Sequence, residues 1–319
     1  MERTERRQVS LSSLAISVWA ALALVSACGG DGGSTPDAAA PSLDGPAAPD
    51  CGAPVIDDSI AAPTCTSKPV VPGVTDLSGT WVARVTAAQV VTAPIVGVMH
   101  NQYVLTMLVT LTQTGTEIVA DGRNCDRLQI NEPNAAAPVV LPEKWAHTET
   151  PVHRTASFAV GAEGYPIFHL RADTEIVGAQ LSSPAECLPT KSDDPAVYDQ
   201  DKDDKPGITV VVKGQSLAGT ICAVQSQTTA VNAIAVSANR LEGDLHFASQ
   251  QNVLESDPDT LGQLYSLGTT TADPTLCNSG FVMVRIADAQ AVDAGAGVDG
   301  GASVGCDWVR ANQAALFGP

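Results

Sequence analysis

The 319-residue chain has few basic and few aromatic residues. Lysine and arginine number 17 against 35 acidic residues, and the formal net charge is -18. Because nucleic-acid binding depends on basic patches that neutralise phosphates, this balance argues against nucleic acid as a partner. Aromatic residues make up 4% of the chain although 44% is hydrophobic, so we expect a globular core of mainly Val, Leu and Ile.

Several motifs of catalysis and metal binding are also missing. The chain contains no Cys-x-x-Cys pair, no phosphate-binding glycine loop and no dinucleotide fingerprint, so zinc-ribbon, thioredoxin-type and nucleotide sites are not indicated. A Gly-x-Ser-x-Gly sequence occurs at 301–305, but it follows low-complexity sequence instead of a strand. Because a nucleophile elbow needs a strand directly before it, we interpret this match as chance and expect a non-enzymatic protein.

The first 27 residues have the anatomy of a secretory signal peptide. A basic start leads into an apolar run that is short for a membrane span. The run ends in LVSAC at 24–28, which resembles the lipobox of bacterial lipoproteins, and this resemblance implies that Cys28 is acylated and becomes the new N-terminus. Gly29, not Asp, follows the cysteine, which by the same resemblance favours the outer membrane. The lipid is then the expected membrane anchor, since the mature chain is acidic.

Composition divides the chain into five segments. A stretch rich in Pro, Ala and Gly follows Cys28, and such a stretch buries too little apolar surface to order itself, so we expect a disordered tether. After a low-complexity stretch, Asp307 is expected to cap a short helix that runs to Phe317. The segments are the signal peptide 1–27, lipidated Cys and linker 28–74, β domain 75–287, Ala/Gly/Asp loop 288–305 and a tail 306–319 that packs on the β domain.

The expected β domain alternates between apolar and polar residues with the period of a strand. The run 102–112 is dense in β-formers, and Thr114-Gly115 turns it into a second strand at 116–120. Strands are also expected at 79–87, 89–98, 154–160, 165–171, 175–180, 207–213, 217–226, 229–238, 240–248 and 280–286. Many short strands separated by turns predict an all-β fold, either an antiparallel β-sandwich or a β-barrel.

Seven cysteines remain once Cys28 is lipidated. An exported chain with this many cysteines is expected to form disulfides, and the odd number leaves at least one thiol without a partner in the same chain. Cys222 lies in an apolar run and is the expected buried free thiol. Cys277 is our guess for the partner of Cys306, although sequence does not give connectivity. The disulfide candidates are Cys51, Cys65, Cys125, Cys187, Cys277 and Cys306.

An acidic loop at 199–207 is the most distinctive polar stretch. Asp199, Asp201, Asp203 and Asp204 place carboxylates at the alternating spacing that Ca²⁺ ligands require, and the segment resembles the DxDxDG calcium loops. Asp204 stands where those loops have Gly, and Val210 stands at the position of the EF-hand glutamate, so a complete EF-hand is excluded. The alternative is a solvated acidic loop without a metal.

A Gly-x-Trp sequence lies at the start of the β domain. The stretch LSGTW at 77–81 resembles the first-strand signature of lipocalins and other calycins, which implies a calycin-like barrel with Trp81 packed across one end. We place no partner arginine for this Trp. A looser resemblance, carried by this start, Cys125, the acidic loop before Pro206-Gly207 and a late Cys306-x-Trp, is to uncharacterised bacterial lipoproteins. It implies secretion and a β fold, without an activity.

Two sets of polar residues remain. His147, Glu149 and His153 lie close together in sequence, but Pro151 breaks any helix that would join them. Glu242, Asp244 and His246 share one strand face, either as metal ligands, as an acid/base set or simply as its wet side.

We therefore expect an outer-membrane lipoprotein that acts as a non-catalytic binding or interaction module of the cell envelope, with structural Ca²⁺. The first alternative is a lipocalin-like carrier of a small apolar ligand, which requires an enclosed cavity. The second is an envelope hydrolase, which requires residues such as His153 and Glu149 to converge in a cleft.

Overall fold

The computed structural model describes residues 52–93, 96–215, 217–275, 277–286 and 304–318. The chain divides into two units, residues 1–47 and 48–319, and every described residue belongs to the second. The strands are β1 (Gly79–Ala93), β2 (Gly97–Thr114), β3 (Glu117–Asn131), β4 (Val139–Val140), β5 (Pro151–Val160), β6 (Pro166–Val177), β7 (Ile208–Lys213), β8 (Ala218–Ser237), β9 (Arg240–Asp257), β10 (Thr269–Ala272) and β11 (Gly280–Arg285). The helices are α1 (Glu143–Ala146), α2 (Asp259–Ser266) and α4 (Cys306–Phe317). The predicted all-β fold is confirmed.

Eight of these strands close into a ring within the described residues. Taken in chain order, β1, β2, β3, β5, β6, β8, β9 and β11 each pair with the next, and β11 pairs back with β1. Every one of these pairings is antiparallel. A ladder that returns to its first strand has no free edges, which is the arrangement of an up-and-down barrel. Of the two predicted architectures, the structure therefore has the barrel.

Alternation along each strand decides which side chains enter the barrel. On β9, Leu241, Leu245 and Phe247 join the main core cluster, while Glu242 and Asp244 lie on the opposite face. The hairpin from β2 to β3 turns at Gly115, whose φ of +63° suits glycine, as the sequence predicts. Alternate side chains from all eight ring strands thus point into the interior.

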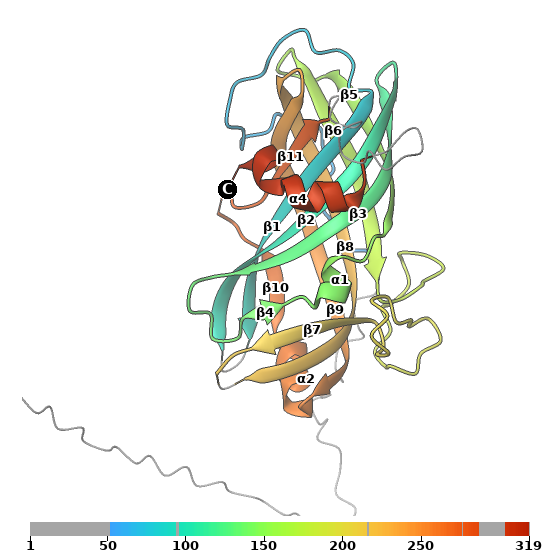
Figure 1. Cartoon of the computed structure of the whole chain (residues 1–319), viewed down its shortest axis with the longest axis vertical. Coiled ribbons are helices and arrows are strands. Elements are labelled where there is room, and N and C mark those ends of the chain that lie inside the picture. Colours follow the sequence, from blue (N-terminus) through green and yellow to red (C-terminus); the bar gives the residue numbers. More distant parts are fainter. Residues whose placement is uncertain (1–51, 94–95, 216, 276, 287–303, 319) are drawn as a thin grey trace, which may run out of the picture. The chain divides into compact units, whose positions relative to one another are not determined.

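The remaining elements extend one end of the ring (Figure 1). β7 pairs with the first part of β8, β4 pairs with β7, and β10 pairs with the last part of β1. α2 follows β9 and buries Leu261 completely, while α1 buries Trp145. We call this the α2 end, and the end that holds the first residues of β1 the Trp81 end.

Two disulfides lie within the described residues, Cys65–Cys277 and Cys125–Cys306. The predicted pairing of Cys277 with Cys306 is therefore wrong, although Cys306 is bonded to the body as expected. Cys125 lies at a register shift in β3. Thr106 pairs with Asp126 and Met107 with Asn124, which leaves Cys125 as an extra, unpaired residue of the strand next to α4. Cys187 is also disulfide-bonded, and Cys222 is the predicted buried free thiol.

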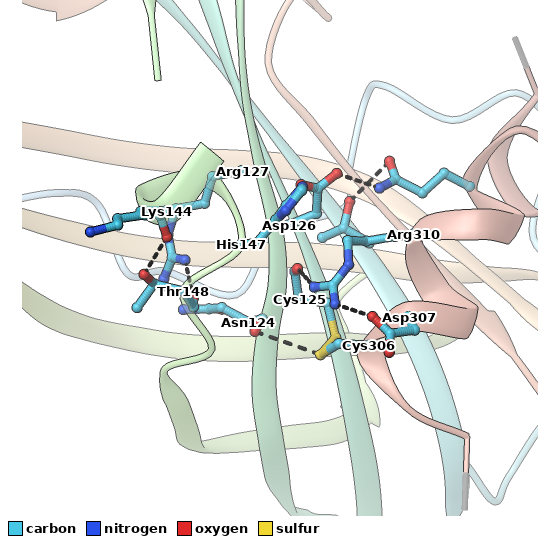
Figure 2. Close-up of polar contacts among 12 residues, drawn as sticks. Asn124, Cys125, Asp126, Arg127, Lys144, His147, Thr148, Cys306, Asp307 and Arg310 are labelled. Carbon is cyan, nitrogen blue, oxygen red and sulfur yellow. Dashed lines mark hydrogen bonds and ion pairs between the residues drawn. A yellow bond between two sulfur atoms is a disulfide. The ribbon is translucent and has the colours of Figure 1, made fainter. Parts of the chain in front are cut away.

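The C-terminal helix α4 packs on the outside of the ring, against β2, β3 and β11. Figure 2 shows its contacts around Cys125, whose carbonyl accepts a 2.7 Å hydrogen bond from Arg310. Asp307 does not cap this helix as predicted. Gly305 occupies the capping position, and Asp307 lies two residues later in the first turn, 2.5 Å from Arg310. Asp307 thus pairs along the helix surface instead of accepting from its first backbone amides.

The part of the predicted linker that the structure describes, residues 52–74, packs on the barrel. The Thr64 and Cys65 backbone amides each donate to the Asp244 carboxylate at 2.8 Å, and Ser67 donates to Glu242 at 2.6 Å. The Val71 amide donates to the Ala235 carbonyl at 2.7 Å. Carboxylates on β9 thus supply acceptors that tie this Pro-rich segment to the barrel.

Candidate ligand-binding lumen

The space inside the ring, which we call the lumen, contains two adjoining cavities. The larger has a volume of about 670 Å³ and lies toward the α2 end, and the smaller has about 280 Å³ and lies deeper. Tyr103, Glu175 and Gln227 line both cavities, so these residues mark the boundary between them. The larger volume falls within the range of pockets that hold small molecules.

Apolar and polar side chains both line the cavities. In the larger cavity the apolar lining includes Val91, Met99, Ile221, Val253 and Tyr265, and several glutamines share the wall with them. In the smaller cavity the apolar lining includes Leu105, Met107, Phe168, Leu170 and Phe281. A molecule that filled both spaces would bury apolar surface against hydrocarbon and would also meet polar side chains.

The Trp81 end of the lumen is closed by packed side chains. Trp81 is fully buried and donates its indole N–H to the Leu77 carbonyl at 2.8 Å. The Arg285 guanidinium lies 4.7 Å from the centre of the Trp81 ring, within range of a cation–π contact. Arg285 also donates to the Asp76 carbonyl at 2.8 Å. Arg285 lies on the last strand of the ring, and the sequence analysis placed no arginine beside Trp81.

A polar belt crosses the middle of the lumen, formed by Tyr103, Arg127, Arg154 and Glu175 on β2, β3, β5 and β6. The charged heads of both arginines are occupied. Arg127 donates to the Thr148 carbonyl and, at 2.8 Å, to Thr150, and it lies 4.3 Å above the Trp145 ring. Figure 2 shows Arg127 and Thr148 on the side of β3 away from α4.

Arg154 is held as firmly as Arg127. It donates to the Thr229 hydroxyl and carbonyl at 3.1 and 2.8 Å and to the Arg171 carbonyl at 2.6 Å. Its Nε atom lies 3.4 Å from the Asp173 carboxylate. Every terminal nitrogen of the two arginines thus already donates to at least one protein oxygen.

Glu175 differs from the arginines because its carboxylate makes no hydrogen bond or close ion pair with any described residue. It lies in the lumen at the boundary of the two cavities. Burial raises its pKa, the charges of Arg127 and Arg154 lower it, and Asp173 raises it further. The pKa of Tyr103 is also raised, chiefly by burial. The belt thus contains one acceptor group without a partner.

Two more polar atoms on the wall of the larger cavity are buried without a hydrogen-bond partner among the described residues. They are the Asn101 Oδ1 atom and the Tyr265 hydroxyl. Burial raises the pKa of Tyr265 to about 12, so the phenol is neutral and can donate. Because buried polar atoms normally have partners, these groups are the ones that a bound molecule could satisfy.

The acidic loop is ordered, and its carboxylates converge. One oxygen from each of Asp199, Asp201 and Asp203 lies within 4.8 Å of the others. Asp199 accepts from the backbone amides of Asp203 and Asp204 at 3.1 and 2.8 Å, and Asp204 takes the left-handed conformation (φ +67°). Asp204 thus makes the sharp turn for which calcium loops use Gly, while its carboxylate stays outside the cluster.

Asp201 is the buried member of this cluster, 3% exposed. Its Oδ2 atom accepts from the Thr209 amide at 3.0 Å, but Oδ1 is buried without a hydrogen-bond partner. Burial raises the pKa of Asp201 to about 6, and the Asp203 charge adds to the increase. The cluster therefore holds one buried acceptor that faces two other carboxylates.

The other polar residues singled out in the sequence form separate pairs. His153 contacts Asp121 at 2.5 Å, Glu149 contacts Arg123 at 3.4 Å, and His147 contacts Asp126 at 3.5 Å. His153 and Glu149 thus do not meet in the arrangement that a hydrolase would need. Glu242 and Asp244 hold the segment 64–67 and act there as structural acceptors.

Sequence analysis missed Glu175, Arg127, Arg154 and Arg285. Arg154 and Arg285 share a strand face with inward apolar residues, so their position was the one available signal. Arg127 and Glu175 gave no such signal, because register shifts in β3 and β6 turn them inward against the strand period.

Several sequence predictions concern residues outside the described ranges. These are the signal peptide, Cys28, Cys51 and the Gly-x-Ser-x-Gly segment as far as Ser303. Among the helices that are described, none has the length and apolarity to cross a membrane. Comparison of the chain with protein-family models, with curated proteins and with solved structures found no match.

Proposed function

We propose that this protein is a binding module whose lumen holds a small, mainly apolar molecule. The observation that carries the proposal is the pair of adjoining cavities of about 670 and 280 Å³ inside the closed ring. Hydrophobic side chains contribute the larger part of both walls, and polar side chains among them can orient a bound molecule, which is the usual composition of a ligand site. The sequence analysis named an enclosed cavity as the feature that separates a carrier from a surface interaction module, so the carrier becomes the leading function.

The cellular setting of this module remains a proposal from the sequence. The signal-like N-terminus and the LVSAC sequence support export and acylation at Cys28. Disulfide bonds are consistent with an oxidising compartment such as the periplasm or the cell surface. We propose that the lipid holds the barrel at the outer membrane, where it would take up its ligand.

The lumen proposal predicts that filling the larger cavity abolishes binding. Val91 lines the cavity from β1, and the Val91→Trp variant places an indole in that space. We expect the affinity for a neutral apolar dye such as Nile red to fall at least about tenfold, measured by fluorescence titration.

The matched control is Val98→Trp, since Val98 is 57% exposed and precedes Met99, which faces the cavity. Adjacent strand residues point to opposite faces, so this indole lies outside the ring. Saturable dye binding that is equal in both variants, or that is missing in the unmodified protein, would contradict the proposal.

We further propose that the acidic loop binds Ca²⁺ as a structural ion. The supporting observation is the buried Asp201 Oδ1 atom, which lacks a partner and lies near the Asp199 and Asp203 carboxylates. Ca²⁺ prefers several carboxylate oxygens on one side of a loop, and it would remove the repulsion among them. The alternative of a solvated acidic loop remains, and the next experiment separates the two.

At pH 7, Ca²⁺ at a hundred times its Kd should add about 2.7 kcal/mol to the free energy of unfolding. For a domain of this size that corresponds to an increase in Tm of roughly 5–10 °C. Asp201→Asn should abolish the increase, whereas Asp259→Asn, on an exposed acid at the start of α2, should keep it. Thermal unfolding with and without Ca²⁺ measures this increase. A Tm of the unmodified protein that does not change with Ca²⁺ would contradict the calcium proposal.

The metal-free protein gives a pH dependence of defined sign. Folded Asp201 keeps its proton up to about pH 6, whereas the unfolded chain releases it near 3.8. The folded state therefore binds more protons in this window, and the Asp201 contribution to the free energy of unfolding falls as the pH rises. Asp201→Asn should remove that contribution.

A further inference from the structure

We propose that the lumen selects molecules with a protonated amine head, which Glu175 holds between the two apolar cavities. This inference rests on the proposed function, since it names the chemical class of the lumen ligand. The observation behind it is a carboxylate in the middle of the barrel, on the wall of both cavities, for which the described part of the chain supplies no hydrogen-bond or ion-pair partner.

The Glu175 side chain is exposed to the lumen, so a bound molecule can reach its carboxylate. A molecule that fills the lumen displaces the water around this carboxylate, and a carboxylate that has neither water nor a partner is unfavourable. The nearest cations are Arg127 and Arg154, but neither forms an ion pair with Glu175 within 4.0 Å, and their terminal nitrogens donate to Thr148, Thr150, Arg171 and Thr229. An ammonium group at the cavity boundary would supply the missing hydrogen bonds.

Most of the other unpartnered atoms of the lumen favour the same head group. Asn101 Oδ1 and Asn124 Oδ1 are pure acceptors, and the Tyr265 hydroxyl can accept as well as donate. The one unpartnered donor among the described lumen residues, Arg154 Nε, lies 3.4 Å from the Asp173 carboxylate. The lumen therefore presents mainly acceptors that lack donors, and an amine carries donors that need acceptors.

A carboxylate head fits the lumen poorly by the same reasoning. It would meet the Glu175 and Asp173 charges, while the arginine nitrogens that could balance it are already engaged. A hydroxyl head is neutral and can donate once, so an alcohol should bind with an affinity between those of the amine and the acid. Among amphiphiles with the same alkyl chain, we therefore expect the amine to bind most tightly, then the alcohol, then the acid.

The apolar part of such a molecule has a place on either side of Glu175. The smaller cavity offers Leu105, Met107 and Phe168, and the larger offers Val91 and Ile221. The alkyl chain of the ligand provides affinity through burial and is the same for all three head groups. Differences in affinity among the three compounds then come from the head group, and such differences are what specificity requires.

The experiment measures binding of dodecylammonium, dodecanol and dodecanoate to the full chain with its disulfides intact. Displacement of Nile red below the micelle concentration of each compound gives the three affinities at pH 7. We expect dodecylammonium to bind at least about tenfold more tightly than dodecanoate. In Glu175→Gln this preference should vanish, while dodecanol affinity stays within about twofold.

The matched control is Glu163→Gln, on an exposed glutamate in the turn between β5 and β6 at the Trp81 end. It changes the net charge equally and should keep the full preference for the amine. Glu175→Gln keeps the shape of the side chain and removes an unpaired charge, so it should fold, and the retained dodecanol affinity verifies that.

The possible results separate the two proposals. If none of the three compounds binds the unmodified protein, the proposed function fails. If all three bind with similar affinity, the lumen binds ligands but the head-group inference is overturned. If the amine preference persists in Glu175→Gln, Glu175 is not its origin and the inference is likewise overturned.

Discussion

Replacing Trp81 by alanine is expected to lower the free energy of unfolding by about 3–5 kcal/mol, the usual cost of removing a large buried aromatic side chain. Trp81 has no exposed surface and closes one end of the lumen. The substitution removes the indole, leaves the Leu77 carbonyl without its donor and takes away the ring beneath Arg285. Urea unfolding followed by far-UV circular dichroism measures the change without relying on tryptophan fluorescence.

Trp308→Ala is the matched control for this effect. Trp308 lies on α4 and is only partly buried, against the small cluster outside the ring. We expect its replacement to cost less than half as much as that of Trp81. An equal or larger loss of unfolding free energy in Trp308→Ala would contradict the conclusion that Trp81 closes the end of the lumen.

Trp81→Phe separates packing from hydrogen bonding at the same position. The phenyl ring keeps a face for Arg285 but cannot donate to Leu77, which accepts from the indole at 2.8 Å. A single hydrogen bond of this kind contributes about 1 kcal/mol. Phe should therefore recover most of the stability that Ala loses.

The strands could be predicted from the sequence wherever their inward face is apolar. On β9, Leu241, Leu245 and Phe247 alternate with polar residues, and the predicted strand coincides with the start of the observed one. β8 shows the opposite case. The sequence predicts two strands there, 217–226 and 229–238, separated at Gln227-Thr228, but one strand runs from Ala218 to Ser237.

The reason for this difference is the lumen itself. Gln225 and Gln227 point inward on β8, toward the cavities. A polar residue facing a hollow interior has the same local pattern as one in a turn, so periodicity cannot tell them apart. Gln227, one of the two residues that separated the predicted strands, is thus a residue of the candidate site.

The candidate site combines residues that lie far apart in the sequence, and a local pattern does not encode such combinations. Arg127 on β3 and Glu175 on β6 lie on the wall of the same cavity only because the strands between them pair in a defined register. Trp81 was recognisable because Gly-x-Trp is a local signature. Its partner Arg285 lies on the last strand and has no signature of its own.

Removing the Cys125–Cys306 disulfide is expected to lower the free energy of unfolding by about 2–5 kcal/mol. The two cysteines are separated by 181 residues, so the cross-link restricts the unfolded chain over much of its length. The Cys125→Ala, Cys306→Ala double variant avoids free thiols that could pair with other cysteines. Urea unfolding under non-reducing conditions gives the difference from the unmodified protein.

The control is Cys222→Ala, which removes one buried sulfur and no cross-link. We expect it to cost less than the double variant, since only local packing changes. If both cost the same, the stabilisation comes from burial of sulfur and not from the cross-link.

The disulfide variant also shows how far the barrel depends on its outer helix. Without the bridge, α4 keeps the contacts of Val309 and Phe317 with the ring, and Gln313 still donates to Asp126 at 2.6 Å. The eight ring strands pair with one another without α4. The strand signal in circular dichroism and dye binding in the lumen should therefore persist. Cleavage by a protease near α4 should become faster, because local opening of the helix no longer has to break a covalent bond. Loss of dye binding in the folded double variant would instead show that α4 supports the lumen through β3. On this strand Cys125 faces α4 outside the ring, and Arg127, two residues later, lines the lumen.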